Sequence, residues 1–363
     1  EIEDTVIDTI YNLTVNWFNS LEIRDDVVYS SYSMFVAFAM LYLGSAGETR
    51  KQLERVFGFD KIPTNAFIDT INVLSKGSGD EMTALLQVTN GIWNDLHFHY
   101  KKEFESKIQQ LSCELSSVDF QHSPEKSRQV INSFVQEATN DMIKNFIPEG
   151  LINELTRCVL VNTVYFKGKW TEMFNKLPSK LQFEGAGMVE GMKKKLHVSS
   201  IVNDDYTSVI IPYEGNSNYM AIVMPTNMST FDVNSIKDVI TKTCNEFDEE
   251  TMLVMPKFKI ETSTEMNTQL KKLGLVDAFG PQADFSEMGD ESIYISSALH
   301  KAIIDVDEKG TEAAAATGMV MMMRSCIPRM TQDIIIDKPF YFALIDNNRV
   351  PLFFGKVSHP RHD

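Results

Sequence analysis

The stretch that decides the fold runs from residue 160 to residue 170 and reads Leu160-Val161-Asn162-Thr163-Val164-Tyr165-Phe166-Lys167-Gly168-Lys169-Trp170. Together with Cys158 and Val159 it makes a long apolar segment rich in β-branched and aromatic residues. Such a segment is typical of a strand that is covered on both faces. It therefore predicts a central strand of a large sheet.

Helical patterns dominate the first third of the chain, and strand patterns dominate the rest. Apolar residues at spacings of three and four predict amphipathic or buried helices, and β-rich runs predict strands. The predicted helices cover residues 5–18, 34–43, 48–57, 131–146 and 264–273. The predicted strands include 86–93, 158–166, 208–211, 221–224, 252–255 and 352–354. This order favours an α+β architecture with large, mainly antiparallel β-sheets.

Composition points to one domain. The chain has 363 residues, of which 43% are hydrophobic, so it can bury a sizeable core. No Pro/Gly/Ser-rich stretch and no sustained charge run divides it, and we expect a single domain over 1–363 without a linker. The longest apolar run, 34–43, is too short to span a bilayer. The acidic start at 1–4 predicts that no signal peptide is present in this sequence.

Charge and cysteine content exclude several classes of partner. The formal net charge of −16 disfavours nucleic acid, which needs a basic surface. The basic triplet at 193–195 is expected in a solvated loop, and a heparin-type cofactor is not supported. The four cysteines lie far apart without C-x-x-C spacing, which predicts free thiols instead of a zinc site or a disulfide framework.

No motif points to an enzyme. The sequence has no G-x-S-x-G elbow, H-E-x-x-H pair or G-x-x-x-x-G-K-[ST] loop. His97 and His99 would share one strand face, which is a weak metal signal, and an ordinary exposed edge explains them better. We expect no catalytic residue, no metal and no cofactor.

The most distinctive segment reads Asp307-Glu308-Lys309-Gly310-Thr311-Glu312-Ala313-Ala314-Ala315-Ala316-Thr317-Gly318. Its alanine run favours a helix, because alanine has the highest helix propensity. The glycines at both ends and the weakly patterned, Met-rich continuation at 319–323 oppose a helix. From the residues alone, helix and irregular loop both stay open.

This segment resembles, almost position by position, the hinge of the reactive-centre loop of serpins. Other serpin-like motifs recur in family order: 30–49, 90–93, 131–139, 211–213, 256–258, 283–286, 337–340 and 352–357. The run at 160–170 is a near-complete match to a specific serpin strand. Ser31 departs from the pattern, since serpins commonly carry proline there, and we expect a looser start to the second helix. The chain is identified as a member of the serpin family. This implies the serpin fold with about nine helices and an exposed reactive-centre loop over about 308–336.

The resemblance implies a suicide-type inhibitor of serine proteases, in which the cleaved loop inserts into the main sheet as a new strand. In inhibitory serpins the residue before the scissile bond lies sixteen positions after the hinge glutamate. Counting from Glu308 gives Arg324, followed by Ser325, and arginine suits trypsin-like proteases. Arg329-Met330 is a second candidate bond. The alternative is a non-inhibitory serpin that acts as a carrier, chaperone or storage protein.

The hinge pattern is compatible with insertion. It comprises Glu308, Gly310, Thr311, Glu312, Ala313, Ala314, Ala315 and Ala316. Alternate residues of a strand share a face. If Thr311 faces the core, then residues 313, 315, 317, 319 and 321 do so too, and all are small or apolar. Glu312, Ala314, Ala316 and Gly318 would face solvent. Gly310 supplies backbone freedom at the start of the movement.

Four further residues take roles from the resemblance. Ser33, Asn162 and His300 match the polar cluster under the point where the sheet opens, and Trp170 matches the tryptophan where the loop enters. An ordinary hydrogen-bonded core pair remains an alternative for Asn162 and His300. The expected partner is a trypsin-like serine protease in a covalent complex with a monomeric inhibitor.

Two N-x-[ST] sequons, at Asn12 and Asn227, would accept glycans in a secreted chain. Asn12 lies on a helix with one buried face, so Asn227 is the better candidate. We expect an extracellular location, with the cytoplasm as the alternative.

Overall fold

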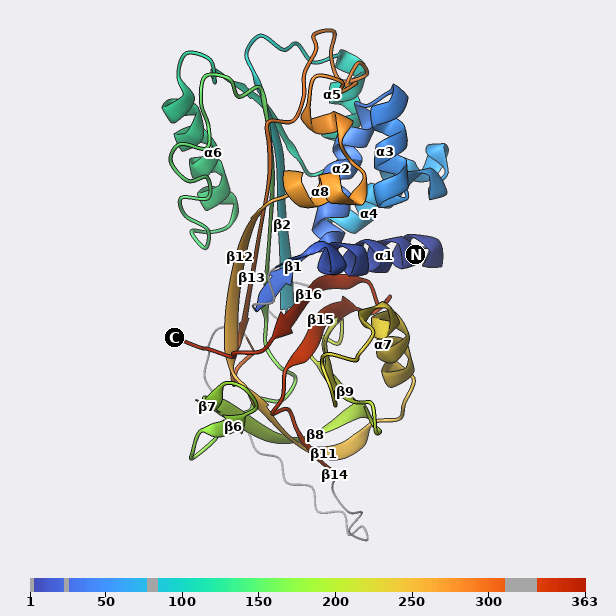
Figure 1. The fold of residues 1–363 in the computed structure, drawn as a ribbon, viewed down its shortest axis with the longest axis vertical. Coiled ribbons are helices and arrows are strands. Elements are labelled where there is room, and N and C mark those ends of the chain that lie inside the picture. The colour runs from blue at the N-terminus through green and yellow to red at the C-terminus, as the bar shows by residue number, and fades with distance from the viewer. Residues whose placement is uncertain (1–2, 23–25, 77–83, 311–331) are drawn as a thin grey trace.

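The computed structural model describes residues 3–22, 26–76, 84–310 and 332–363. Within them the chain is elongated, with one sheet running along the long axis and a second, more twisted sheet at one end (Figure 1). Most helices gather beside the first sheet, and α7 lies against the second. This α+β layout confirms the predicted architecture.

The first sheet has five strands in the order β12-β13-β4-β2-β3. The strands are β2 (Ala84–Asp95), β3 (Glu114–Val118), β4 (Cys158–Gly168), β12 (Phe258–Glu265) and β13 (Ser297–Val306). β2 with β4 and β12 with β13 are antiparallel, whereas β13 with β4 and β2 with β3 are parallel. A parallel pair in the middle of the sheet is therefore its distinctive feature.

The predicted central strand is β4, and it is covered on both faces as expected. Leu160 and Val164 face the larger hydrophobic core, which includes apolar side chains of the buried helix α2 (Ser31–Leu43). Val161 and Tyr165 face a second core beneath α6 (Pro124–Ala138). Figure 1 shows α6 on one side of this sheet and α2 and α3 on the other.

The second sheet has nine strands in the order β1-β16-β15-β10-β9-β8-β11-β14, with β5 also paired to β8. Its strands are β1 (Val27–Tyr29), β5 (Asn175–Lys176), β8 (Gly191–Val202), β9 (Tyr206–Pro212), β10 (Asn218–Pro225), β11 (Glu249–Pro256), β14 (Gln332–Ile335), β15 (Phe340–Asp346) and β16 (Pro351–Val357). Its neighbouring pairs are antiparallel except β11 with β14. A separate two-stranded hairpin joins β6 (Leu181–Phe183) and β7 (Gly187–Val189).

The described residues form eight α-helices, against about nine predicted. Besides α2 and α6 these are α1 (Asp4–Ser20), α3 (Gly47–Phe57), α4 (Phe67–Ser75), α5 (Lys102–Gln109), α7 (Ile236–Cys244) and α8 (Asn267–Leu273). Short 3-10 turns cover Phe59–Lys61, Thr64–Ala66, Val233–Ser235 and Asp277–Phe279. None of the helices in this part of the chain is long and apolar enough to cross a membrane.

Three local predictions need correction. The helix predicted over 131–146 lies at Pro124–Ala138, because Pro124 opens its first turn and Asn140 and Asp141 follow it with φ of 50° and 64°. The triplet at 193–195 is part of β8, not a loop, and two of its lysines pair with Glu172 and Glu250. His97 and His99 lie beyond the end of β2 and share no strand face.

The start of α2 is also tighter than expected. Ser30 caps the helix by accepting a hydrogen bond from Ser33 N, and Ser31 Oγ lies 2.6 Å from Thr14 Oγ1 in a buried contact. A serine in place of proline therefore ties α2 to α1.

Candidate functional site

A tight turn at Asp307–Gly310 (the hinge turn) follows β13 at the start of the predicted hinge segment. Gly310 N donates to Asp307 O at 3.3 Å, and Lys309 N donates to the Asp307 carboxylate at 2.8 Å. This turn reverses the chain direction, so that Gly310 lies antiparallel to Asp307. Gly310 is the last described residue before 311–331.

Gly310 is in close contact with the backbone that follows β4. It has a φ of 102° and forms isolated β-bridges with Lys169 and with Asp307. A Cβ at this position would lie 2.3 Å from Gly168 O and 2.6 Å from Trp170 N. Only glycine combines this positive φ with so close an approach.

Trp170 lies against the Asp307–Gly310 turn. Its indole Nε1 donates to Asp307 O at 2.8 Å, and its backbone N donates to Lys309 O at 3.2 Å. Its ring stacks on Tyr213 with centroids 4.3 Å apart. The turn is thus fastened to a buried aromatic pair.

Glu308 is held from two directions. Its carbonyl accepts a hydrogen bond from Phe174 N at 2.8 Å, and its carboxylate pairs with Lys257 Nζ at 3.1 Å. The two side chains are only 19% and 16% exposed. Because the pair is partly desolvated, removal of either partner would leave a partly buried charge unpaired.

Ser33, Asn162 and His300 meet in a fully buried polar cluster deeper in the sheet. Asn162 Oδ1 accepts from Ser33 Oγ at 2.8 Å and lies 2.6 Å from His300 Nδ1. Asn162 Nδ2 donates to Asn90 Oδ1 at 2.6 Å and to Ser33 O at 3.2 Å. The cluster links β13, β4, β2 and α2.

The hydrogen bonds fix the protonation of His300. Its Nε2 accepts from Ser30 N at 3.2 Å, so Nδ1 carries the proton and donates to Asn162. Burial lowers the pKa of His300 to about 3, and the imidazole is neutral at physiological pH. Because the cluster is neutral, its hydrogen bonds can be broken and formed again without moving a charge.

The ladder between β4 and β13 does not extend to the Trp170 end. Pairing runs from Ser297 with Val159 to Ile303 with Tyr165. β13 continues to Val306 and β4 to Gly168, so both strands extend three residues beyond the ladder that joins them. The ends of β4 and β13 next to the Asp307–Gly310 turn are therefore not paired with each other.

The structure thus brings the predicted residues together in two groups. Glu308, Gly310 and Trp170 meet at the Asp307–Gly310 turn, and Ser33, Asn162 and His300 form the buried cluster. Sequence reasoning did not predict some of the residues that these two groups contact. One of them, Asn90, lies in the serpin-like motif at 90–93. The remaining predicted residues lie outside the described part of the chain: Thr311, Glu312, Ala313, Ala314, Ala315, Ala316, Arg324, Ser325, Arg329 and Met330.

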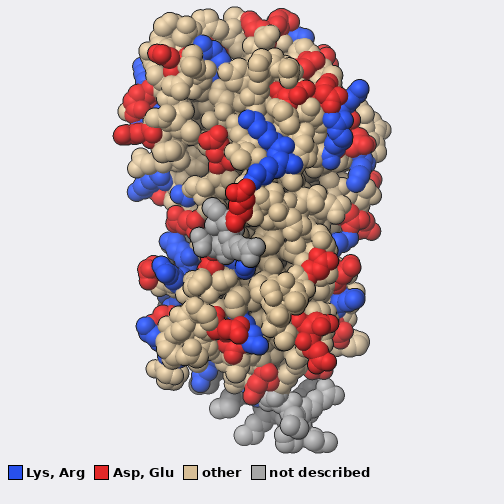
Figure 2. All heavy atoms as spheres, viewed as in Figure 1, with Lys and Arg blue, Asp and Glu red and all other residues tan. Residues whose placement is uncertain are grey.

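The sequons and the cysteines are also placed. Asn227 is exposed in a turn after β10, where its Oδ1 accepts from Ser229 N at 3.0 Å. The hydroxyl of Thr14, in the other sequon, is buried and bonded to Ile10 O. Three cysteines, Cys113, Cys158 and Cys244, are free thiols. Basic and acidic side chains are interspersed over the face in Figure 2.

Comparison with known proteins gives concordant matches. The family model described as "Serpin (serine protease inhibitor)" matches residues 8–360. A serpin-like protein of Methanosarcina mazei is 32% identical, covering 93% of this chain and 82% of that protein. Leukocyte elastase inhibitor of Bos taurus is 31% identical, covering 92% and 93%. The crystal structure of Serpin48 from Tenebrio molitor superposes with a TM-score of 0.84 at 24% identity, covering 99% of this chain and all of that one.

Proposed function

Because the chain belongs to the serpin family of serine protease inhibitors, we propose that it traps a trypsin-like serine protease that cleaves it between Arg324 and Ser325. The observation that carries this proposal is the parted end of β4 and β13, with the Asp307–Gly310 turn beside it. A chain that continues from Gly310 between these strands would run antiparallel to both. It would replace one parallel pair by two antiparallel pairs, which are slightly more stable per residue.

Both bridges of Gly310 support one register for the inserted strand. Continuing the pairing with Asp307 places Ala313 opposite Ile304, and continuing the pairing with Lys169 places it opposite Phe166. In the same register Thr311 meets Val306 and Ala315 meets Ala302. These neighbours face the larger core, which supports the predicted inward set of small or apolar residues.

The opposite face of the inserted strand would be partly covered, which differs from the sequence-based expectation of solvent. Val161, Tyr165, Leu299 and Ile303 on this face belong to the second core beneath α6. In the proposed register Ala314 would lie between Tyr165 and Ile303. A small residue fits there because a large one would have to displace α6.

The chemistry of the trap follows from insertion. Attack by the protease serine on the carbonyl of Arg324 forms an ester and releases the amine of Ser325. From Gly310 to Arg324 the extended chain spans roughly 46 Å at about 3.3 Å per residue. Insertion would therefore drag the protease to the far end of the sheet, and distortion of its active site would stall hydrolysis of the ester.

The end of the loop supports Arg324 over Arg329. The loop was predicted to run to residue 336, but Gln332–Ile335 form β14 beside β11. In the sequence, Arg329 stands only three residues before this strand. Arg324 stands eight residues before it, so a protease has more chain with which to dock.

The proposal includes the remaining features of the chain. We propose one domain over 1–363 that acts as a monomer, without a cofactor. Three described cysteines are free, and free thiols are typical of reducing compartments, which favours the cytoplasmic alternative over the extracellular one. Glycosylation at Asn227 would apply only to a secreted form.

The proposal is tested by whether the protein forms a covalent complex with trypsin. Incubation with trypsin should give a band that resists SDS and heat, and the fragment released from the complex should begin at Ser325. A fragment that begins at Met330 would move the reactive bond to Arg329. Complete cleavage without any complex would support the non-inhibitory alternative, a carrier, chaperone or storage serpin.

A further inference from the structure

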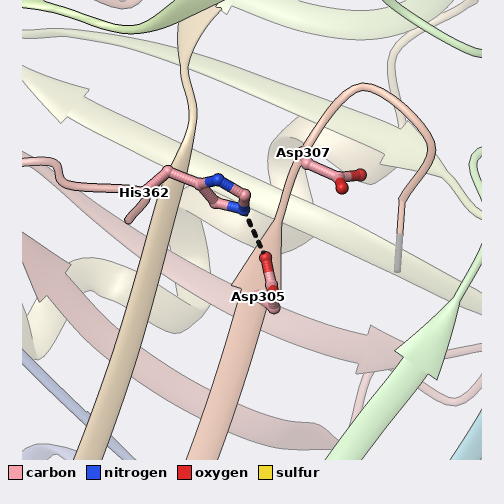
Figure 3. Close-up of side chains that lie close together, drawn as sticks. All are labelled: Asp305, Asp307 and His362. Carbon is pink, nitrogen blue, oxygen red and sulfur yellow. Dashed lines mark hydrogen bonds and ion pairs between the residues drawn. The ribbon is translucent and has the colours of Figure 1, made fainter. Parts of the chain in front are cut away.

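Three metal-ligand side chains, two from the end of β13 and the turn after it and one from near residue 363, lie close together beside the hinge turn. Asp305 comes from the end of β13, Asp307 from the turn, and His362 from the segment after β16 (Figure 3). One donor atom from each lies within 4.8 Å of the others, and His362 Nε2 is 2.7 Å from Asp305 Oδ1. The proposed trapping reaction uses the backbone of Asp307 but neither Asp305 nor His362.

The segment that carries His362 is held in place by backbone hydrogen bonds. Asp26 accepts from His359 N at 3.0 Å, and Arg361 O accepts from Lys259 N at 2.7 Å. Lys259 is itself the partner of Asp305 in the β12–β13 ladder. His362 therefore reaches Asp305 across β12 from a fixed backbone position.

The two carboxylates have few charged partners, although Asp307 accepts a hydrogen bond from Lys309 N. Within the described part of the chain, the ion pair of Asp305 is with His362, and Asp307 has no ion pair. The lysines nearby pair elsewhere, Lys257 with Glu308 and both Lys259 and Lys301 with Glu261. The side chains of Asp305 and His362 are 32% and 20% exposed, so an ion can enter and still be partly shielded from water.

We propose that Asp305, Asp307 and His362 bind one divalent transition-metal cation of the zinc type. One imidazole nitrogen with two carboxylate oxygens is a ligand set that Zn²⁺ accepts, with water at the open position, whereas Mg²⁺ and Ca²⁺ prefer oxygen alone. The cation takes the place of the hydrogen shared by His362 and Asp305. With bonds of about 2.0–2.2 Å, donor atoms stand roughly 3.3 Å apart, so the Asp307 carboxylate moves inward by about 1–2 Å.

A bound cation would add a link between the C-terminal segment and the chain from Asp305 to Asp307, which now share one side-chain ion pair, that of His362 with Asp305. It would hold β13, the hinge turn and residues 358–363 together, close to the Asp307 carbonyl that binds Trp170. The site is thus placed to stiffen the hinge.

The test is calorimetric titration of EDTA-treated protein with ZnCl₂. We expect one ion per chain, and we expect His362→Ala and Asp307→Asn each to weaken binding at least tenfold. His359→Ala is the matched control, because it removes an exposed imidazole from the same segment and should leave the affinity unchanged. MgCl₂ should give no binding at the same concentrations. Circular dichroism of each variant confirms that it is folded.

A pair of histidines elsewhere in the described chain is an alternative zinc site that the test must distinguish from the proposed one. His97 and His122 lie with ring centroids 6.3 Å apart, and each Nδ1 contacts an aspartate. If zinc binding is lost in His122→Ala but kept in His362→Ala, the ion belongs to that pair and the proposal is wrong. Absence of zinc binding to the wild-type protein would overturn it as well. No protease is used, so the result is independent of the proposed inhibition.

Discussion

Replacing Gly310 by alanine tests whether the hinge turn is seated against the backbone after β4. The new Cβ would lie 2.3 Å from Gly168 O, 2.6 Å from Trp170 N and 2.7 Å from the Lys169 Cα. All three are backbone atoms and cannot swing away as a side chain would. Alanine would also have to keep a φ near 102°, which costs about 1–3 kcal/mol for a residue with a Cβ. The turn must therefore either lose its contact with Trp170 or displace the end of β4.

The size of the effect follows from the chain length. Strain plus displacement amounts to about 2–4 kcal/mol. For 363 residues, an unfolding entropy of about 2.1 cal/mol/K per residue gives about 0.8 kcal/mol per kelvin, so the thermal midpoint should fall by roughly 3–5 °C. Thermal melting of the intact, uncleaved protein by circular dichroism measures this fall.

Two other glycines provide matched controls. Gly187 has a φ of 76°, and a Cβ added there would meet nothing within 4 Å, so Gly187→Ala adds strain without a clash. Gly280 has neither a positive φ nor a close neighbour, and Gly280→Ala should leave the midpoint unchanged. If Gly310→Ala lowers the midpoint no more than Gly187→Ala does, the turn is not pressed against Gly168 and Trp170, and its expected seating is wrong.

Four further predictions concern the loop and the cluster. Arg324→Ala should abolish inhibition of trypsin and leave the melting curve intact, as residual activity assays will show. Thr311→Arg should convert the inhibitor into a substrate, because burying a guanidinium costs several kcal/mol; complex formation at wild-type stoichiometry would contradict the register. Cleavage by catalytic trypsin should raise the thermal midpoint sharply, and an unchanged midpoint would favour a non-inhibitory serpin. Since burial lowers the pKa of His300 to about 3, the unfolded chain binds a proton first as pH falls. Native stability should therefore decline from about pH 6.5 toward pH 3, and urea titrations should show a shallower decline for His300→Gln.

Local patterns predicted the elements best where one physical signal was strong. The all-apolar run at 34–43 and the β-rich run at 158–166 became α2 and β4. The helix at 131–146 was displaced because its apolar spacing continues past its end, whereas Pro124 and the positive φ of Asn140 set the real bounds. The lysine triplet at 193–195 failed for another reason. Partners distant in sequence, Glu172 and Glu250, neutralise charges that looked solvated.

The candidate site was predictable only as far as the resemblance carried it. Ser33, Asn162 and His300 are far apart in sequence, and no spacing rule brings them together. Asn90 joins them because β2 pairs with β4 in a register that sets Asn90 opposite Asn162. Lys257 meets Glu308 through an ion pair that only the folded chain creates. Such contacts depend on strand order and register, which local sequence does not encode.

The proposed insertion register accounts for a polar residue in the loop at the level of the buried Ser33–Asn162–His300 cluster. His300 lies opposite Asn162 in the β13–β4 ladder, and insertion must separate their 2.6 Å contact. In the proposed register, which continues both bridges of Gly310, Thr317 would lie between these two residues. Thr317 is the one inward residue after Thr311 that carries a hydroxyl, and a hydroxyl can accept from His300 Nδ1 while it donates to Asn162 Oδ1. Any apolar residue there would leave a buried donor and acceptor unpaired, at about 1–3 kcal/mol for each group. The chain therefore carries a polar side chain at the level where the closed sheet is fastened by polar bonds.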